Sequence, residues 1–451
     1  MTASEIAIIT VQFLLSLSLL IILHEAGHFL PARLFKMRVE KFFLFFDVKF
    51  ALLKKKIGET EYGIGWLPLG GYVKISGMID ESMDKEQMAQ PPQPWEFRSK
   101  PAWQRLIVML GGVIVNFALA WLIYVGMMFT WGEQILATEN IGDALAVSEF
   151  MTEKIGIQTG DEVLTVDGET SERFQEMAQN MLFAKNIKVL RDGNEVNLEV
   201  PEDFIGQLVD ANTKSSQISY RIPLLIGKIP DTSLNKNAGL KKGDLVLDIN
   251  NQGLRYFDQI AEYLATQKNQ TVVAKIQRDK EIQDISLQIS EKGFLEIVPA
   301  RVKLTELGEL GFYNLSIKEY SFGQSFGAGS RKFVEQFKSF GKQLKIIATP
   351  STGAYKGLGS FISIAKIFPT TWNWEIFWKI TAFLSIMLGV LNLLPIPALD
   401  GGHAMFLIYE LIAGKKPGDK FMEYAQIVGF IFLISLFVFA FGNDIYRHLI
   451  K

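Results

Sequence analysis

The sequence predicts a polytopic α-helical membrane protein with four transmembrane helices and two tandem β-rich modules between the second and third helices. Two features of the composition indicate this class: 49% of the 451 residues are hydrophobic, yet 21% are charged. The hydrophobic fraction together with a mean hydropathy above zero is too apolar for an ordinary soluble enzyme, and the charged fraction is too high for a bundle of membrane spans alone. A membrane core joined to a water-soluble part accounts for both.

Four stretches are apolar and long enough to cross a bilayer, which requires about 20 residues in a helix. They are residues 6–30, 106–131, 376–399 and 425–442. Basic residues cluster after the first stretch, before the second, and between the third and fourth. The positive-inside rule places these clusters in the cytoplasm. Both termini and the segment between the second and third spans are then predicted to lie outside, with the lipid bilayer around the spans.

The motif His24-Glu25-Ala26-Gly27-His28 closes the first apolar stretch. Histidines four residues apart lie on one face of a helix, so both imidazoles can reach one metal ion. Glu25 lies outside the ligand set and is placed to accept a proton from the attacking water. The alternative is a polar helix end just beyond the bilayer. Because ionisable side chains at membrane depth are costly and usually functional, the motif predicts a zinc site inside the membrane.

A catalytic zinc needs a third protein ligand, and a chain without cysteine leaves only His, Asp and Glu. Pro395 and Pro397 interrupt the third span, and Asp400 is the first charged residue beyond them. Prolines break a helix and free backbone groups at membrane depth. The helical rise from the charged flanks puts His24 and Asp400 toward the cytoplasmic side of the bilayer. Asp400 is therefore the predicted third ligand, with His403 as its rival.

Residues 61–76, between the first two spans, read EYGIGWLPLGGYVKIS. Alternating apolar residues interrupted by glycine and proline predict bent strands in a membrane-associated β-hairpin. Two placements are open: the hairpin dips into the membrane beside the metal site, where protein shields its backbone, or it lies on the membrane surface.

The segment between the second and third spans contains an internal repeat, because residues 155–164 match 238–247 and residues 188–192 match 275–279. Copies this far apart indicate two domains in tandem, and glycine turns followed by alternating strands make both domains β-rich. Neither copy contains a histidine. Residues 330–348 form a basic amphipathic pattern, which predicts a helix that lies in the membrane interface or packs on the protein's own spans.

These motifs resemble the site-2 proteases, a family of intramembrane zinc metalloproteases. The resemblance covers nearly the whole chain and rests on the tandem modules and three motifs: His24-Glu25-x-x-His28, Pro68-Leu69-Gly70-Gly71-Tyr72-Val73 and Asn392-x-x-Pro395-x-x-x-Leu399-Asp400-Gly401. It implies that His24, His28 and Asp400 bind zinc, that Glu25 is the general base, and that Asn392 helps to hold the substrate backbone. The chain departs from the family at Gly359-Ser360-Phe361-Ile362, where relatives usually have Gly-Pro-Ile after a glycine.

The resemblance also implies a function. The protein would hydrolyse transmembrane segments of single-span membrane proteins in a bacterial inner membrane, with an anti-sigma factor as substrate after a first cleavage. The modules would be PDZ-like domains facing the periplasm, which either bind peptides or exclude bulky substrates. The turns Gly156-Ile157 and Gly239-Leu240 resemble the PDZ loop that holds a peptide carboxylate. The charge balance, 46 basic against 48 acidic residues, argues against a nucleic-acid partner.

Two other functions remain open: a different membrane zinc metallopeptidase with a glutamate as third ligand, and a membrane-tethered PDZ scaffold without proteolysis. The predicted segments are 1–32 (first span), 33–104 (cytoplasmic segment with the hairpin), 105–131 (second span), 132–222 and 223–308 (the two modules), 309–374 (linker with the amphipathic helix), 375–413 (third span) and 414–451 (loop and fourth span).

Overall fold

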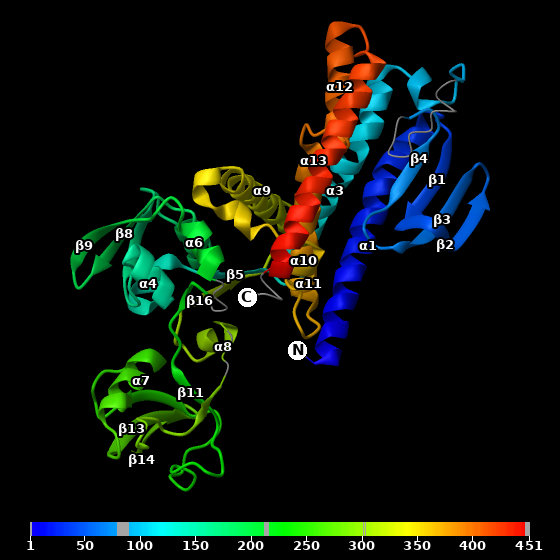
Figure 1. Cartoon of the computed structure of the whole chain (residues 1–451). Helices are drawn as coiled ribbons and strands as arrows, with labels where there is room; N and C mark the ends of the chain where they lie inside the picture. The colour runs from blue at the N-terminus through cyan, green and yellow to red at the C-terminus, as the bar shows by residue number, and fades with distance from the viewer. Residues whose placement is uncertain (1, 79–89, 212–215, 301, 303, 447–451) are drawn as a thin grey trace. The chain divides into compact units, whose positions relative to one another are not determined.

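The computed structural model describes residues 2–78, 90–211, 216–300, 302 and 304–446. The chain forms two compact units (Figure 1). The membrane unit consists of Met1–Glu133, Glu319–Pro350 and Ala354–Lys451, and the module unit consists of Gln134–Lys318 and Ser351–Gly353. Each unit has its own hydrophobic core.

In the described part of the membrane unit, four helices are long and apolar enough to span a bilayer. They are α1 (Ala3–Leu34), α3 (Ala102–Thr130), α11 (Trp374–Leu393) and α13 (Asp419–Ile445). Helix α1 begins at a capping box, in which the side chains of Thr2 and Glu5 each accept a hydrogen bond from the backbone of the other. The four predicted spans are confirmed, although the third ends earlier than expected.

Glycines bring α1 and α3 into backbone contact. A Cβ atom on Gly27 would lie 2.4 Å from the carbonyl oxygen of Gly111, and a Cβ on Gly111 would lie 1.9 Å from the carbonyl oxygen of Gly27. Small residues are what allow helices in a membrane to approach this closely. The main chain of α3 is thereby held against the turn of α1 that carries His24 and His28.

A four-stranded sheet lies beside α1 (Figure 1). Its strands are β1 (Val39–Leu44), β2 (Phe46–Ile57), β3 (Thr60–Leu67) and β4 (Tyr72–Ile75), in the order β2-β3-β1-β4. The predicted hairpin over residues 61–76 is wrong, because β1 lies between β3 and β4 and pairs with both. The hairpin that forms joins β2 to β3 and turns at Gly58, whose φ is 61°.

The two prolines break the helix of the third span, as predicted. Helix α11 stops at Leu393, and a short non-helical turn leads into α12 (Asp400–Ala413). Ala398 in this turn has a φ of 80°, a left-handed conformation that is uncommon for a residue with a side chain. The turn makes Asp400 the first residue of a new helix.

The amphipathic helix is longer than predicted and packs on the protein's own spans. Helix α9 (Phe322–Ile347) places Phe340 against Phe383 of α11, and Phe333 and Phe337 against Phe117 of α3. The lysines of the helix lie mostly on its other face. Of the two alternatives left open by the sequence, the structure contains the intramolecular packing.

The C-terminal end of α13 is hydrogen-bonded to the chain segment that departs from the family pattern. Asp444 is buried, and its carboxylate accepts hydrogen bonds from the backbone N–H and the hydroxyl of Ser360 and from the hydroxyl of Ser363. A proline at position 360 has no N–H to donate. The departure therefore belongs to a local hydrogen-bond network. The nearby short helices are η4 (Pro350–Thr352), η5 (Ala354–Gly357) and α10 (Phe361–Ala365); η1 (Phe97–Ser99) precedes α3.

The module unit contains two β-rich modules in sequence. The first is built from β5 (Glu133–Leu136), η2 (Thr138–Asn140), η3 (Gly142–Ala144), β6 (Leu145–Val147), α4 (Glu149–Ile155), β7 (Glu162–Val166), α5 (Phe174–Leu182), β8 (Asn186–Arg191), β9 (Asn194–Glu199), α6 (Phe204–Ala211) and β10 (Ile218–Tyr220). The second is built from β11 (Leu224–Lys228), β12 (Leu245–Ile249), α7 (Phe257–Thr266), β13 (Thr271–Arg278), β14 (Glu281–Gln288) and β15 (Val298–Pro299), followed by α8 (Leu304–Glu309) and β16 (Leu315–Lys318).

The sheets differ between the modules. Strands β7, β8 and β9 form one sheet of the first module, and β6 pairs with β10. The second module has a single five-stranded sheet in the order β14-β13-β12-β11-β15. The core of the first module also takes in Tyr256, Leu307 and Tyr313, which lie beyond its predicted end at residue 222. The two modules therefore share side chains at their junction.

The repeated glycine–aspartate turns carry the same polar contacts in both modules. Asp161 accepts two hydrogen bonds from Arg191, which also donates to the carbonyl oxygen of Gly156. In the second module Arg278 donates in the same way to Asp244 and to the carbonyl oxygen of Gly239. The repeat seen in the sequence is thus also a repeat of one hydrogen-bonded turn.

Candidate metal centre

The two histidines of the motif occupy one face of α1, one turn apart. His24 and His28 are each 8% exposed, and their Nε2 atoms are 3.4 Å apart. The helical periodicity that predicted a shared face is therefore realised. The remaining ring nitrogens, Nδ1 of both residues, are turned toward α3.

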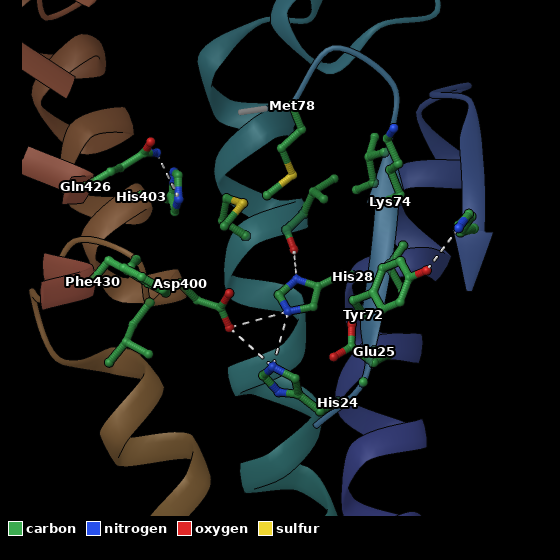
Figure 2. A pocket seen from close by; sticks show the side chains of 18 of the residues that line it. His24, Glu25, His28, Tyr72, Lys74, Met78, Asp400, His403, Gln426 and Phe430 are labelled. Carbon is green, nitrogen blue, oxygen red and sulfur yellow. Dashed lines mark hydrogen bonds and ion pairs between the residues drawn. The ribbon is translucent and has the colours of Figure 1, made fainter. Parts of the chain in front are cut away.

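Asp400 reaches the histidines from the start of α12, as Figure 2 shows. Its Oδ2 atom is 3.4 Å from Nε2 of His24 and 3.3 Å from Nε2 of His28. These distances exceed the 2.7–2.9 Å or so of a charge-assisted hydrogen bond. Among the described residues, no hydrogen-bond donor reaches Asp400 Oδ2, although the atom is buried.

The spacing of His24 Nε2, His28 Nε2 and Asp400 Oδ2 fits coordination of one metal ion better than direct hydrogen bonds among the three atoms. A tetrahedral zinc bound at about 2.0–2.1 Å separates its ligand atoms by about 3.3–3.4 Å, which matches the separations of the three atoms. A buried carboxylate oxygen without a donor is unfavourable unless a cation compensates its charge. Two imidazoles and one carboxylate are also an ordinary ligand set for catalytic zinc.

A family model described as peptidase family M50 matches residues 12–436. The chain belongs to peptidase family M50. As a member of this family, the site-2 proteases, it is an intramembrane zinc metalloprotease, and its four apolar helices fit a bacterial inner-membrane protein.

Individual relatives of known name match this chain along almost their whole length. The chain is 29% identical over 464 residues to the regulator of sigma E protease of Haemophilus influenzae, covering 97% of this chain and 98% of the relative. It is 26% identical over 467 residues to a putative zinc metalloprotease of Vibrio cholerae, with 97% and 98% covered. It is 26% identical over 462 residues to protease RseP of Yersinia pestis, with 96% and 98% covered.

The candidate metal centre of this M50 protein lies at the wall of a cavity of about 710 Å³. Helices α1, α3, α12 and α13 and strand β4 all contribute to its lining, so the cavity brings together segments far apart in the sequence. Glu25 lines it beside the two histidines (Figure 2). At the sheet side, burial alone would raise the pKa of Asp47, but hydrogen bonds from Tyr72 and Lys41 outweigh it and hold the pKa below its usual range.

His403, the rival third ligand, also lines the cavity but is not grouped with the other three residues. Its Nε2 atom lies 3.4 Å from the side-chain nitrogen of Gln426 on α13 (Figure 2). Among the described residues, His24, His28 and Asp400 are the group whose ligand atoms converge. The geometry therefore favours the predicted set over the rival.

Asn392 lies at the end of α11, next to the metal centre. Its side-chain nitrogen is 3.2 Å from Nε2 of His24, and the residue is half-buried. The structure therefore places Asn392 beside one of the two histidines of the motif.

Sequence reasoning missed the part of the site that α3 supplies. Val108, Gly112 and Asn116 lie against the two histidines. One signal was available, because Asn116 is the only side-chain amide in the apolar stretch 106–131. Polar side chains within membrane spans are rare, and they usually face the interior of the bundle.

Proposed function

We propose that this protease hydrolyses peptide bonds within the transmembrane segments of single-span membrane proteins, with His24, His28 and Asp400 holding the zinc, Glu25 as general base and Asn392 binding the substrate backbone. The observation that carries the proposal is the buried convergence of three ligand atoms, one of which has no hydrogen-bond donor among the described residues.

When bound, zinc polarises the scissile carbonyl group and acidifies the attacking water. Glu25 lines the cavity next to both histidines and accepts the proton of that water. It then passes the proton to the nitrogen of the departing amine. The amide of Asn392 donates to the backbone of the substrate on the open side of the centre.

A substrate helix must unwind before it is cut, because its carbonyl groups are engaged in its own hydrogen bonds. The unwound segment can be held by pairing with the edge of strand β4 opposite β1. Strand β4 is a terminal strand of its sheet, and Gly71, Tyr72 and Val73 line the same cavity as the metal centre. An extended segment added to this edge would run past Glu25, which is the strand-addition mode of recognition.

The replacement Glu25→Gln tests the chemistry. We expect turnover to fall by about 10²–10⁴-fold while the zinc content remains that of the wild type, because the base is lost and all three ligands remain. The probe is a single-span membrane protein whose outer domain has been removed, with the products identified by mass spectrometry. Near-normal turnover in Glu25→Gln would refute the role of Glu25, and cuts confined to soluble loops would refute the intramembrane site.

The two modules, in this proposal, are PDZ-like domains on the periplasmic side that exclude substrates with bulky outer domains. An anti-sigma factor would then be cut only after another protease has trimmed it. The hydrogen bonds of the first repeated turn support exclusion over peptide capture, because its backbone is already engaged within the module. The N–H of Gly156 donates to the carbonyl oxygen of Thr152 at the end of α4, and the carbonyl oxygen of Gly156 accepts from Arg191. The orientation follows the basic flanks of the spans.

Deleting the modules tests exclusion. The hydroxyl of Tyr320 donates to Glu133 at 3.1 Å, so the two ends of the inserted unit lie side by side and a short linker can replace residues 134–318. We expect this variant to retain zinc and to cleave untrimmed substrates, whereas the same deletion carrying Glu25→Gln should cleave them about 10²–10⁴-fold more slowly. Loss of cleavage of trimmed substrates, with zinc content and folding intact, would instead assign peptide capture to the modules.

A further inference from the structure

Both histidines of the metal centre present Nε2 to Asp400 and turn Nδ1 toward helix α3. Nδ1 of His28 lies 2.8 Å from the carbonyl oxygen of Val108. Nδ1 of His24 lies 3.0 Å from the side-chain amide of Asn116. Each histidine therefore has one partner on α3 behind it.

The partners on α3 follow the same spacing as the histidines. Val108, Gly112 and Asn116 are four residues apart, so they form one stripe along the helix. His28 faces the start of this stripe and His24 its end. Gly112 lies between, where a Cβ atom would come within 2.5 Å of Nε2 of His28 and 2.6 Å of Cε1 of His24. The stripe is thus a cradle for two imidazoles, open at its middle position.

If His24 binds a metal through Nε2, its Nδ1–H requires a hydrogen-bond acceptor, and Asn116 is the side chain beside it. An imidazole that binds a metal through Nε2 carries its proton on Nδ1, and that proton requires an acceptor. For His28 the acceptor is the carbonyl of Val108. For His24 the side chain of Asn116 supplies one, because an amide has both a donor nitrogen and an acceptor oxygen, which a half-turn of the group exchanges.

Two further observations support this orientation of the amide. Asn116 is wholly buried, and its Oδ1 atom has no hydrogen-bond partner among the described residues. With Oδ1 toward His24, the buried oxygen gains a donor and Nδ1–H gains an acceptor. The backbone of Asn116 is held as well, since the hydroxyl of Ser385 on α11 donates to its carbonyl oxygen at 2.7 Å.

We propose that Asn116 is a positioning residue of the metal centre, whose amide oxygen accepts the Nδ1–H of His24 and thereby fixes the tautomer and the ring orientation of this ligand. The inference rests on the ligand set proposed above. Partners of this kind typically change metal affinity by about 10–100-fold when they are removed.

The test compares three variants of the full-length protein in detergent. Asn116→Leu removes the acceptor at similar size, and Asn116→Asp retains an acceptor. Thr381→Val is the control, because Thr381 is also wholly buried and polar but pairs with Ser16 rather than with a histidine. Zinc affinity is measured by competition with a chelator, and Co²⁺ absorption reports the geometry of the ligands.

We expect zinc affinity to fall by about 10–100-fold in Asn116→Leu, with an altered Co²⁺ spectrum, while Asn116→Asp and Thr381→Val stay near the wild type. Wild-type affinity and spectrum in Asn116→Leu would overturn the inference, and so would an equal loss in Thr381→Val. His24→Ala and Asp400→Asn separate the two levels of the argument: if they retain zinc, the ligand set itself is wrong. If they lose zinc while Asn116→Leu does not, only the role of Asn116 fails.

Discussion

Two carboxylates, one in each unit, have opposite surroundings. Asp244 of the second module is 1% exposed, and donors reach both of its oxygens: Nε of Arg278 at 2.7 Å, Nη2 of Arg278 at 2.5 Å and the N–H of Lys241 at 2.7 Å. Asp400 of the membrane unit faces the ring nitrogens of two histidines, and no described donor reaches its Oδ2.

The difference distinguishes a structural carboxylate from one that we propose binds a metal ion. A buried charge that is fully hydrogen-bonded holds its turn in place, and removing it leaves the partner charge without compensation. A buried carboxylate without donors destabilises the fold until a cation binds it. The hydrogen-bonded arrangement occurs twice, at Asp161 and Asp244, in corresponding turns of the two modules.

The largest expected effect on activity comes from replacing Asp400, the carboxylate without a described donor to its Oδ2. Asp400→Asn should abolish peptidase activity and lower zinc content, because an amide is a poor zinc ligand. The thermal stability of the zinc-free protein should not fall, since the variant removes an uncompensated buried charge. Zinc content by atomic absorption and melting temperature after chelation check both parts. Full zinc content with a lowered melting temperature would make Asp400 structural, like Asp244.

Glycines also differ between the two regions. A Cβ atom on Gly156, Gly160, Gly239 or Gly243 of the repeated turns would meet no atom closer than 3.6 Å, whereas a Cβ beside the metal centre would clash. A Cβ atom on Gly71 would lie 2.4 Å from Cγ2 of Ile21 and 3.4 Å from Cγ of Glu25. The same Cβ would lie 2.8 Å from the carbonyl oxygen of Phe43, so Gly71→Ala should push the chain before β4 away from α1 beside Glu25 and lower kcat/KM by about 10²-fold. Gly70→Ala is the matched control, because its Cβ would meet only the ring of Phe46, at 3.0 Å, and its loss should be smaller. Equal losses in both variants would contradict this account.

A third change probes the satisfied carboxylate of the first module. Asp161→Asn should reduce the free energy of unfolding of that module by about 1.5–3 kcal/mol, because charged hydrogen bonds from Arg191 and a bond from the N–H of Gln158 are weakened. Zinc content and cleavage of trimmed substrates should not change. Pulse proteolysis of the full chain in urea measures the effect. The exposed Asp192→Asn is the control and should stay within about 0.5 kcal/mol of the wild type.

The smallest effect concerns pH. Burial alone would raise the pKa of Asp244, but hydrogen bonds from Arg278 and Lys241 outweigh it and lower the pKa below the ordinary 3.8. The unfolded chain therefore binds the proton more readily than the folded one. The stability that Asp244 contributes should be fully present above about pH 5 and be lost as the pH falls through the folded pKa. Hydrogen exchange of the second module, corrected for intrinsic rates, checks this, and Asp244→Asn should lack the pH-dependent part.

Some features of the fold follow from the sequence because the forces behind them are local. A run of about 20 apolar residues must be helical in a bilayer, so all four spans could be predicted. Proline ends a helix wherever it stands, which placed the break before Asp400. The shared face of His24 and His28 needs only the helical period.

The sheet could not be predicted in the same way. Glycine and proline in residues 61–76 indicated two strands, β3 and β4, and their closeness in the sequence suggested that these strands pair with each other. Each pairs with β1 instead. The actual order inserts β1 between them. Strands β1 and β4 pack on α1 and pair with each other, a tertiary arrangement that spacing in the sequence does not reveal. The length of α9 was also underestimated, since its first turns lack the basic pattern.

By itself, the sequence determined the class of the protein, its spans, the repeat of its modules, and the motif that carries two of the expected ligands. Only the tertiary structure decided that Asp400 rather than His403 joins the two histidines, and that Asn116 and Gly112 of α3 lie behind them. The physical reason is range. Periodicity and helix breaking act over a few residues, whereas a metal centre is assembled from segments more than 370 positions apart, whose approach depends on glycine contacts between helices.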